Sequence, residues 1–411
     1  MPASHSKFSN CYRIEMKPGQ QSKNSWCNCK SGKRYWQCCR TKLPPPGLLE
    51  KAHLMFAERG RREKEYQELY GYARPAMAVR AFGDKVMIAI GSRLYQQNRD
   101  GDYTFLDAIH DHALDFFGVQ MLGAEEMKPL DERHPALQWM SVFVDHTNKL
   151  HDEGNANPHQ GQIGAGAAWY RFAYDLYTIA DNAKLEALMK RRLLDVKMFQ
   201  GARHELWVAA LCITAGFTLE FEDETDNTTT HFEFVAVDRL SPTRIAVEAK
   251  SRHRYGVKGF GGGKDVPPGA TVGIRDLVLS AYKKQTNLPF YVFVDVNLPP
   301  AATEEIWEGW LLELHKTMWE LEQEGYSDPS PDNAIFFAND PSHFLRDDQI
   351  GHDADRLWLQ HYQAAKPRTP HPTPDLIERF RKAHRQRNVP PVDLVDSNTW
   401  ETISRKREVA S

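Results

Sequence analysis

Four charged residues in the second half of the chain have the types and spacing of a site for a divalent cation and a phosphodiester. In the segment VEAK, Glu248 and Lys250 are two residues apart, so on a β-strand both side chains project from the same face. Glu233 lies on the preceding predicted strand, where a hairpin sets it beside Glu248, and Glu205 opens a predicted helix. Carboxylate oxygens suit Mg²⁺, and a neighbouring lysine assists an attacking water or stabilises charge on the phosphate. We therefore expect these four residues to be catalytic, with Glu233 and Glu248 as the magnesium ligands.

Each of these residues also has a simpler interpretation. A Glu and a Lys two apart on an exposed strand are usually a solvated surface pair, but Val247 and Ala249 alternate with them in a run flanked by apolar strands. A carboxylate near the start of a helix often only complements the helix dipole, and this alternative stays open for Glu205. Asp238 competes with Glu233, although we expect it at the turn and on the opposite face of the strand.

An alternation of helices and strands must position these side chains. The predicted elements are, in order, a helix at 195–216, strands at 217–222, 231–238 and 244–252, a helix at 271–285, a strand at 289–298, a helix at 303–324 and an edge strand at 334–340. The first helix ends at Gly216, a residue type common at helix C-termini, and polar turns separate the three short strands. The run PFYVFVDVNL is almost entirely apolar, which is typical of a strand buried on both faces. These elements predict a mixed α/β layer.

The element order and the Glu-x-Lys segment together resemble the PD-(D/E)XK nuclease superfamily over residues 192–345. That superfamily has a restriction-endonuclease-like α-β-β-β-α-β core, which presents an acidic residue and then E-x-K on neighbouring strands. The resemblance implies that Glu233 is the first strand acid, Glu248 the second metal ligand and Lys250 the lysine. It further implies Glu205 as the helix acid of many members, Mg²⁺ or Mn²⁺ as the catalytic metal, and DNA as the substrate. The chain departs from the usual pattern in having Glu rather than Asp at position 233.

A basic, glycine-rich segment follows the Glu-x-Lys pair. The cationic residues that we expect to contact nucleic acid there are Arg252, Arg254, Lys258 and Lys264. The glycines of GFGGGK do not form a nucleotide-binding P-loop, because that motif needs Gly at position 258 and Ser or Thr at position 265. We expect instead a mobile loop that closes over a phosphate backbone, and a disordered linker is the alternative. In related nucleases the next helix contacts the backbone, which implies the same for Lys284 and Gln285.

Four of the six cysteines lie close together near the N-terminus, in CNCKSGKRYWQCC. They are Cys27, Cys29, Cys38 and Cys39. Four thiolates match the tetrahedral preference of Zn²⁺, whereas adjacent cysteines form poor disulfides; free or redox-active cysteines are the alternative. The spacing, the Ser31-Gly32-Lys33 turn and the final cysteine pair resemble the SEC-C zinc motif. This resemblance implies a structural zinc and a docking module for a partner.

Length and composition indicate a globular protein with several domains. The chain has 411 residues, 41% hydrophobic and 26% charged residues, and a formal net charge of −3, so any nucleic-acid surface must be a local patch. No apolar run approaches the ~20 residues needed to span a bilayer, and the N-terminus lacks the apolar core of a secretory signal. We therefore expect a cytoplasmic protein without membrane association. The predicted domains are a zinc module at 1–45, a mainly helical domain at 46–190, the nuclease-like domain at 191–345 and a basic C-terminal extension at 346–411.

These patterns together predict a metal-dependent nuclease that hydrolyses DNA, with a structural zinc module for docking. The competing hypothesis is a non-catalytic, zinc-containing adaptor that binds nucleic acid or a protein partner. Hydrolysis of another phosphoester is a third hypothesis, because no residue pattern reads the base or the sugar. Convergence of the strand acid with Glu248 and Lys250 within metal-bridging distance favours the enzyme, and a misplaced strand acid favours the adaptor.

Overall fold

The computed structural model describes much of the chain between residues 104 and 388 and short stretches before it. The described residues are 14–15, 57, 61, 78–82, 85–90, 93–98, 104–153, 164–183, 185–221, 232–254, 270–284, 286–299, 301, 303–324, 329–344 and 358–388. The predicted site residues outside them are Cys27, Cys29, Cys38, Cys39, Lys258, Lys264 and Gln285. Zinc binding and the nucleic-acid contacts of these residues stay predictions.

The chain divides into two compact units. The first comprises Met1–Tyr70, Arg74–Ala108 and Val392–Ser411, and the second comprises Gly71–Ala73 and Ile109–Pro391. The first unit contains an antiparallel sheet in the order β1-β4-β3-β2. Its strands are β1 (Ile14–Glu15), β2 (Ala78–Phe82), β3 (Lys85–Ile90) and β4 (Arg93–Asn98). β2 to β4 lie within the range 46–190 that was predicted to be mainly helical.

Five helices precede the large sheet of the second unit. They are α2 (Phe105–Glu126), which begins in the first unit, α3 (Pro135–Asp152), α4 (Gly164–Asn182), α5 (Ala187–Leu194) and α6 (Phe199–Thr214). α4 is buried from Gly164 to Ile179, and α6 is buried along almost all of its length, as expected for helices with apolar residues on every side. Gly216 follows α6 with a φ of 95°, a conformation that glycine adopts without strain. The helices expected in a separate domain up to residue 190 thus share one unit with the sheet.

The second unit contains a six-stranded mixed sheet in the order β10-β9-β8-β7-β6-β5. Its strands are β5 (Phe217–Phe221), β6 (Phe234–Asp238), β7 (Arg244–Ser251), β8 (Phe290–Asp295), β9 (Ala334–Asn339) and β10 (Trp358–Tyr362). β5, β6 and β7 pair antiparallel, β7, β8 and β9 run parallel, and β10 is antiparallel to β9. β8 and β9 are buried along their whole length, which explains their almost continuous apolar sequence.

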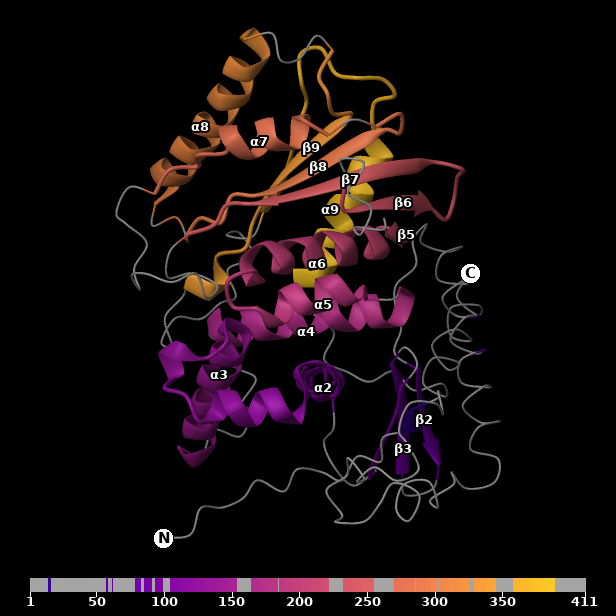
Figure 1. Cartoon of the computed structure of the whole chain (residues 1–411), viewed down its shortest axis with the longest axis vertical. Helices are drawn as coiled ribbons and strands as arrows, with labels where there is room; N and C mark the ends of the chain where they lie inside the picture. The colour runs from indigo at the N-terminus through magenta and orange to yellow at the C-terminus, as the bar shows by residue number, and fades with distance from the viewer. Residues whose placement is uncertain are drawn as a thin grey trace, which may run out of the picture. The chain divides into compact units, whose positions relative to one another are not determined.

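Helices cover both faces of this sheet (Figure 1). The helices that follow the third strand are α7 (Arg275–Tyr282), α8 (Glu304–Gln323) and α9 (Pro374–Asn388). α7 and α8 lie on one face, where Val278 and Val292 share a core. α6 and α9 lie on the other, and the Phe380 ring of α9 stacks on Phe217 with ring centroids 5.6 Å apart. The layers are therefore helix, sheet and helix, which confirms a mixed α/β class.

The predicted order of helix, three strands, helix and strand agrees with α6, β5, β6, β7, α7 and β8. One other prediction needs correction. The segment at 334–340 is not an edge strand, because β10 pairs with β9 along its outer side. For the basic C-terminal extension at 346–411, the sequence left open whether it adds to DNA binding or packs on the core; residues 358–388 supply β10 and α9, whose Phe380 and Ala383 are buried.

Candidate active site

Glu248 and Lys250 project from β7 and form an ion pair. Since β7 lies between β6 and β8, Glu248 is fully buried (0% exposed), whereas the side chain of Lys250 is 21% exposed. Nζ of Lys250 contacts Oε1 of Glu248. A buried carboxylate is costly unless a cation accompanies it, and the alternation of the strand supplies that cation two residues away. The burial of Glu248 distinguishes this pair from a solvated surface pair.

A second lysine reaches the same carboxylate from a different element. Lys284 follows the C-terminus of α7, and its Nζ lies 3.9 Å from Oε1 of Glu248. Burial raises the pKa of Glu248, while Lys250 and then Lys284 act in the opposite direction. Glu248 is therefore a buried acid between two lysines. The spacing of the sequence does not reveal this contact, because it depends on how the end of α7 packs beside β7.

Glu233 lies at a β-bulge directly before β6. Phe234 is the register partner of Val247 in β7, and the N–H of Glu233 also donates to the Val247 carbonyl, at 3.0 Å. Two residues of one strand thus oppose one residue of its neighbour, an arrangement that re-aims a side chain. Burial raises the pKa of Glu233 well above its usual value, and the negative charges of Glu205 and Glu248 raise it further. The carboxylates of Glu205 and Glu248 therefore both lie close enough to Glu233 to act on its charge.

Glu205 joins this cluster from α6, and an arginine from α5 holds it. Nη1 of Arg192 donates to Oε1 of Glu205 at 2.9 Å, and Nη2 lies 2.6 Å from Oε2. This two-pronged contact is the strong geometry for an arginine and a carboxylate. Glu205 is 8% exposed and lies in the second turn of α6, beyond the first turn where the helix dipole acts. The sequence did not predict the contact of Arg192 with Glu205, because the two residues belong to different helices.

The cluster has the donor chemistry of a site for a hard divalent cation. Its acids supply carboxylate oxygens, the ligands that Mg²⁺ prefers, and Oε2 of Glu248 has no hydrogen-bond partner among the described residues. A cation would also offset the repulsion that raises the pKa of Glu233. Within the described part of the chain, no three His, Cys, Asp or Glu side chains already converge as a metal site. Metal binding at this cluster therefore stays a prediction.

Asp238, the competing acid, lies at the other end of β6 and belongs to a different contact. Nη2 of Arg379 in α9 donates to Oδ1 of Asp238 at 2.8 Å, and Nη1 donates to Oδ2 at 3.2 Å. Burial would raise the pKa of Asp238, but Arg379 and Ser241 hold it below its usual value. Asp238 therefore joins α9 to the sheet, and Glu233 is the strand acid that accompanies Glu248.

The two described arginines of the basic segment donate to main-chain carbonyls. Nη1 of Arg252 donates to the carbonyl of Gly273. Nη2 of Arg254 donates to the carbonyl of Thr271 at 2.9 Å, and Nε donates to the carbonyl of Asn297. These contacts tie the start of the basic segment to the chain before α7 and after β8. Contact of either arginine with nucleic acid stays a prediction.

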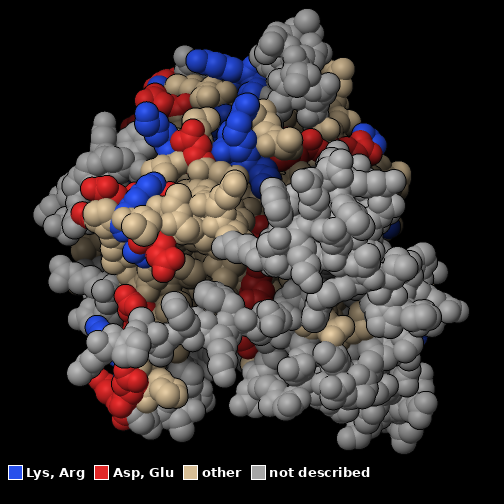
Figure 2. Space-filling model, turned by 60° about the horizontal axis from the view of Figure 1, so that its bottom comes forward, with Lys and Arg blue, Asp and Glu red and all other residues tan. Residues whose placement is uncertain are grey.

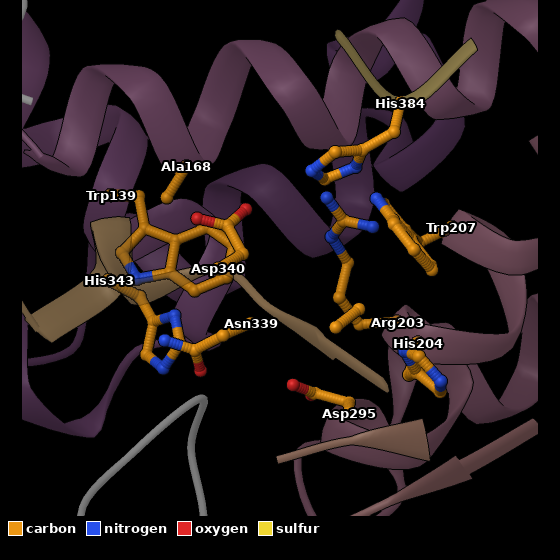
Figure 3. A pocket seen from close by; sticks show the side chains of 11 residues that line it. Trp139, Ala168, Arg203, His204, Trp207, Asp295, Asn339, Asp340, His343 and His384 are labelled. Atoms are coloured by element: carbon orange, nitrogen blue, oxygen red, sulfur yellow. The ribbon is translucent and has the colours of Figure 1, made fainter. Parts of the chain in front are cut away.

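A separate pocket lies at the carboxyl ends of β8 and β9, beside α6 and α9 (Figure 3). Its polar lining includes Arg203, His204, Asp295, Asp340 and His343. These groups bind other protein groups: Nη1 of Arg203 donates to Asp175 at 2.6 Å, and Nη1 of Arg171 donates to Asp340 at 2.9 Å. About 30 Å³ of space remains, which is room for about two water molecules. We therefore assign these residues to a structural network, separate from the candidate active site.

Comparisons of this chain with protein-family models, with curated proteins and with solved structures found no match. No helix in the described ranges is long and apolar enough to cross a membrane. The function must therefore be argued from the residues of the candidate site.

Proposed function

We propose that this chain is a metal-dependent nuclease of the PD-(D/E)XK type that hydrolyses phosphodiester bonds of DNA. The observation that carries the proposal is the buried carboxylate of Glu248, held between Lys250 and Lys284 beside the mutually repelling Glu233 and Glu205. The order α6, β5, β6, β7, α7 and β8 supports it, because the superfamily that the Glu-x-Lys segment resembles has a helix, three strands, a helix and a strand in its core.

In the proposed site, Glu233 and Glu248 hold Mg²⁺ or Mn²⁺, and Glu205 assists. When bound, such a cation polarises the phosphate and lowers the pKa of a bound water. The carboxylates must be ionised to bind it. Since the pKa of Glu233 and of Glu248 is raised in the protein without a cation, chiefly by burial, cation binding releases protons and strengthens as the pH rises.

The two lysines supply positive charge where negative charge develops. Hydrolysis forms a bond between a water oxygen and phosphorus, breaks one P–O ester bond, and transfers a proton of the water to the leaving oxygen through solvent. Lys250 is partly exposed, so it assists the attacking water and stabilises the charge on the phosphate oxygens. Lys284 then compensates the buried charge of Glu248 while Lys250 contacts the phosphate.

The N-terminal cysteines are proposed as a docking module. Their spacing and their resemblance to the SEC-C motif support a structural Zn²⁺ held by Cys27, Cys29, Cys38 and Cys39. Structural zinc is bound by four protein ligands and leaves no open position for a substrate. The module therefore serves to hold a partner, and the chemistry belongs to the Glu248 site.

The first test is cleavage of plasmid DNA, single-stranded DNA and RNA with Mg²⁺ or Mn²⁺. We expect the wild-type protein to cut DNA only with the metal, and Lys250→Ala to lose about 10²–10³-fold in rate, as when one group that stabilises the transition state is removed. Lys316→Ala is the matched control, because Lys316 is an exposed lysine of α8 paired with Glu320. Thermal unfolding of both variants shows that they remain folded. If the protein binds DNA without cutting it, and Lys250→Ala does not change the binding, the proposal that it is a nuclease is overturned.

One observation favours the alternative, an adaptor without catalysis. Glu248 and Glu205 already have cationic partners in Lys250 and Arg192, and the described residues contain no converged metal site. Calorimetric titration with Mn²⁺ distinguishes the two functions. The nuclease is supported if the wild-type protein binds Mn²⁺ and Glu233→Gln does not. The adaptor is supported if the wild-type protein and Glu233→Gln bind Mn²⁺ equally weakly.

A further inference from the structure

The outer surface of α5 and of the turn that follows it carries an excess of positive charge. Lys190 and Arg191 are exposed on the helix, and Lys197 is exposed in the turn. We name these three residues the α5 basic face. Lys190 and Arg191 line a shallow groove of about 460 Å³, together with Leu194 and Asp195.

The cations of the α5 basic face have no carboxylate partner among the described residues. Some exposed cations elsewhere do have one: Nη2 of Arg385, for example, lies 2.6 Å from a carboxylate oxygen of the same helix. The nearby Asp195 instead accepts a hydrogen bond at Oδ1 from the main-chain N–H of Lys197, at 2.8 Å. The ammonium of Lys190 lies 5.5 Å from the centre of the Phe116 ring, a contact that leaves its charge in place. Within the described residues, the face therefore presents exposed positive charge that no carboxylate pairs with.

The α5 basic face adjoins the candidate active site through the chain itself. Arg192 directly follows Arg191, makes the two-pronged contact with Glu205, and acts through its charge on Glu233. One helical turn rises about 5.4 Å, and one DNA strand carries a phosphate about every 3.4 Å of its axis. Because Lys190 and Arg192 point about 200° apart on the helix, a nucleic-acid backbone has to follow the surface of α5 over several phosphates to reach both the α5 basic face and the carboxylate cluster.

We propose that the α5 basic face binds the phosphodiester backbone of the nucleic acid whose reacting phosphate lies at Glu205, Glu233 and Glu248. This inference rests on the proposed nuclease function and names its substrate-binding surface. With a formal net charge of −3, the protein needs a local patch of cations to attract a polyanion. Lys and Arg atoms also gather near the top of the face drawn in Figure 2, which labels no residue and therefore neither adds to nor detracts from the α5 basic face.

Fluorescence anisotropy without a divalent metal separates binding from cleavage. The probes are a labelled DNA duplex and an RNA of the same sequence. The test variant carries Lys190→Gln, Arg191→Gln and Lys197→Gln. The matched control removes three exposed cations from α9 and carries Arg381→Gln, Lys382→Gln and Arg385→Gln. Arg192 is unchanged in both, so the contact with Glu205 is preserved.

We expect the test variant to bind more weakly and with a shallower salt dependence. The slope of log Kd against log salt concentration should fall by about 2 to 3, because each phosphate contact contributes about 0.9. The α9 control should change this slope by less than about 1. The ratio of DNA to RNA affinity identifies which backbone the face binds.

The outcomes separate this inference from the proposed function. A loss confined to the test variant supports the inference even where Mg²⁺ and Mn²⁺ produce no cleavage, in which case only the nuclease proposal fails. Binding by the test variant equal to wild type overturns the inference even where cleavage is intact. A larger loss in the α9 control, or no binding of either probe by the wild-type protein, also overturns it.

Discussion

Two groups of buried carboxylates lie in the second unit, and their partners differ. In the structural network beside α9, Asp175 is contacted by Arg203 and Arg387, and Asp340 is contacted by Arg171. Burial alone would raise the pKa of Asp340, but Arg171 and a neighbouring hydroxyl hold it well below its usual range. Arg171 thus helps to keep Asp340 ionised, and the network joins α4, α6 and α9.

In the cluster of Glu205, Glu233 and Glu248, burial and the neighbouring carboxylates outweigh the nearby cations at Glu233. In the part of the chain that the structure describes, no cation forms an ion pair with Glu233, whose pKa is raised by burial and by both neighbouring carboxylates. Such an arrangement costs free energy when no cation is bound. Acids held with raised pKa values are typical of functional sites. The comparison therefore contrasts a satisfied network, whose acids are paired with arginines, with a cluster that is left unsatisfied at Glu233, and it supports the proposal that this cluster carries the chemistry.

Asp340→Asn tests the satisfied network and should have the largest effect on stability. The variant leaves Arg171 buried opposite a neutral group, so we expect the free energy of unfolding at pH 7 to fall by about 2–3 kcal/mol. Because the pKa of Asp340 is lowered in the folded protein, its contribution is present above the ordinary Asp pKa and is lost as the pH falls through the lowered value. Urea unfolding at several pH values measures this loss.

The control for Asp340→Asn is Glu378→Gln, which removes the exposed ion pair with Arg385. Exposed pairs contribute about 0–1 kcal/mol, so the control should change stability little at any pH. Equal losses for the two variants, or a loss that grows at acid pH, would contradict the role given to Asp340.

Glu233→Gln tests the unsatisfied cluster and should stabilise the protein. The raised pKa of Glu233 means that its favourable protonated state is populated below the ordinary Glu pKa and is lost as the pH rises through the raised value. The variant should therefore gain about 2–4 °C in Tm at pH 8, the shift for about 1 kcal/mol in a domain of this size. The gain should disappear near pH 4. Thermal unfolding at several pH values checks it, and a gain that is largest at acid pH would refute the assignment.

Lys284→Gln tests a single contact of the cluster, and its effect on the cleavage rate should be smaller than that of Lys250→Ala. We expect the cleavage rate to fall about tenfold, a change of about 1.4 kcal/mol, because Lys250 remains beside Glu248. Since Lys284 lowers the pKa of Glu248, its removal should also shift the pH–rate profile to higher pH. Lys283→Gln is the matched control, because Lys283 is exposed and adjacent. An unchanged pH profile would mean that Lys284 does not act on Glu248.

The elements from α6 to β9 and the common face of Glu248 and Lys250 could be predicted from the amino-acid sequence. The period of two along a strand puts both side chains on one face, and the apolar run at 289–298 requires burial on both faces. The turn at Gly216 likewise follows from the residue type. These properties depend only on neighbouring residues, which is why the order from α6 to β8 could be predicted.

Which charged side chains form ion pairs could not be predicted from the sequence. Arg192 of α5 contacts Glu205, Lys284 after α7 contacts Glu248, and Arg379 of α9 binds Asp238, which lies at the other end of β6 from Glu233. The sheet was predicted to end at β9, but β10 extends it and α9 packs on it. Ion pairing depends on which elements pack together over long sequence separations, and the local periodicities of helices and strands do not encode those distances.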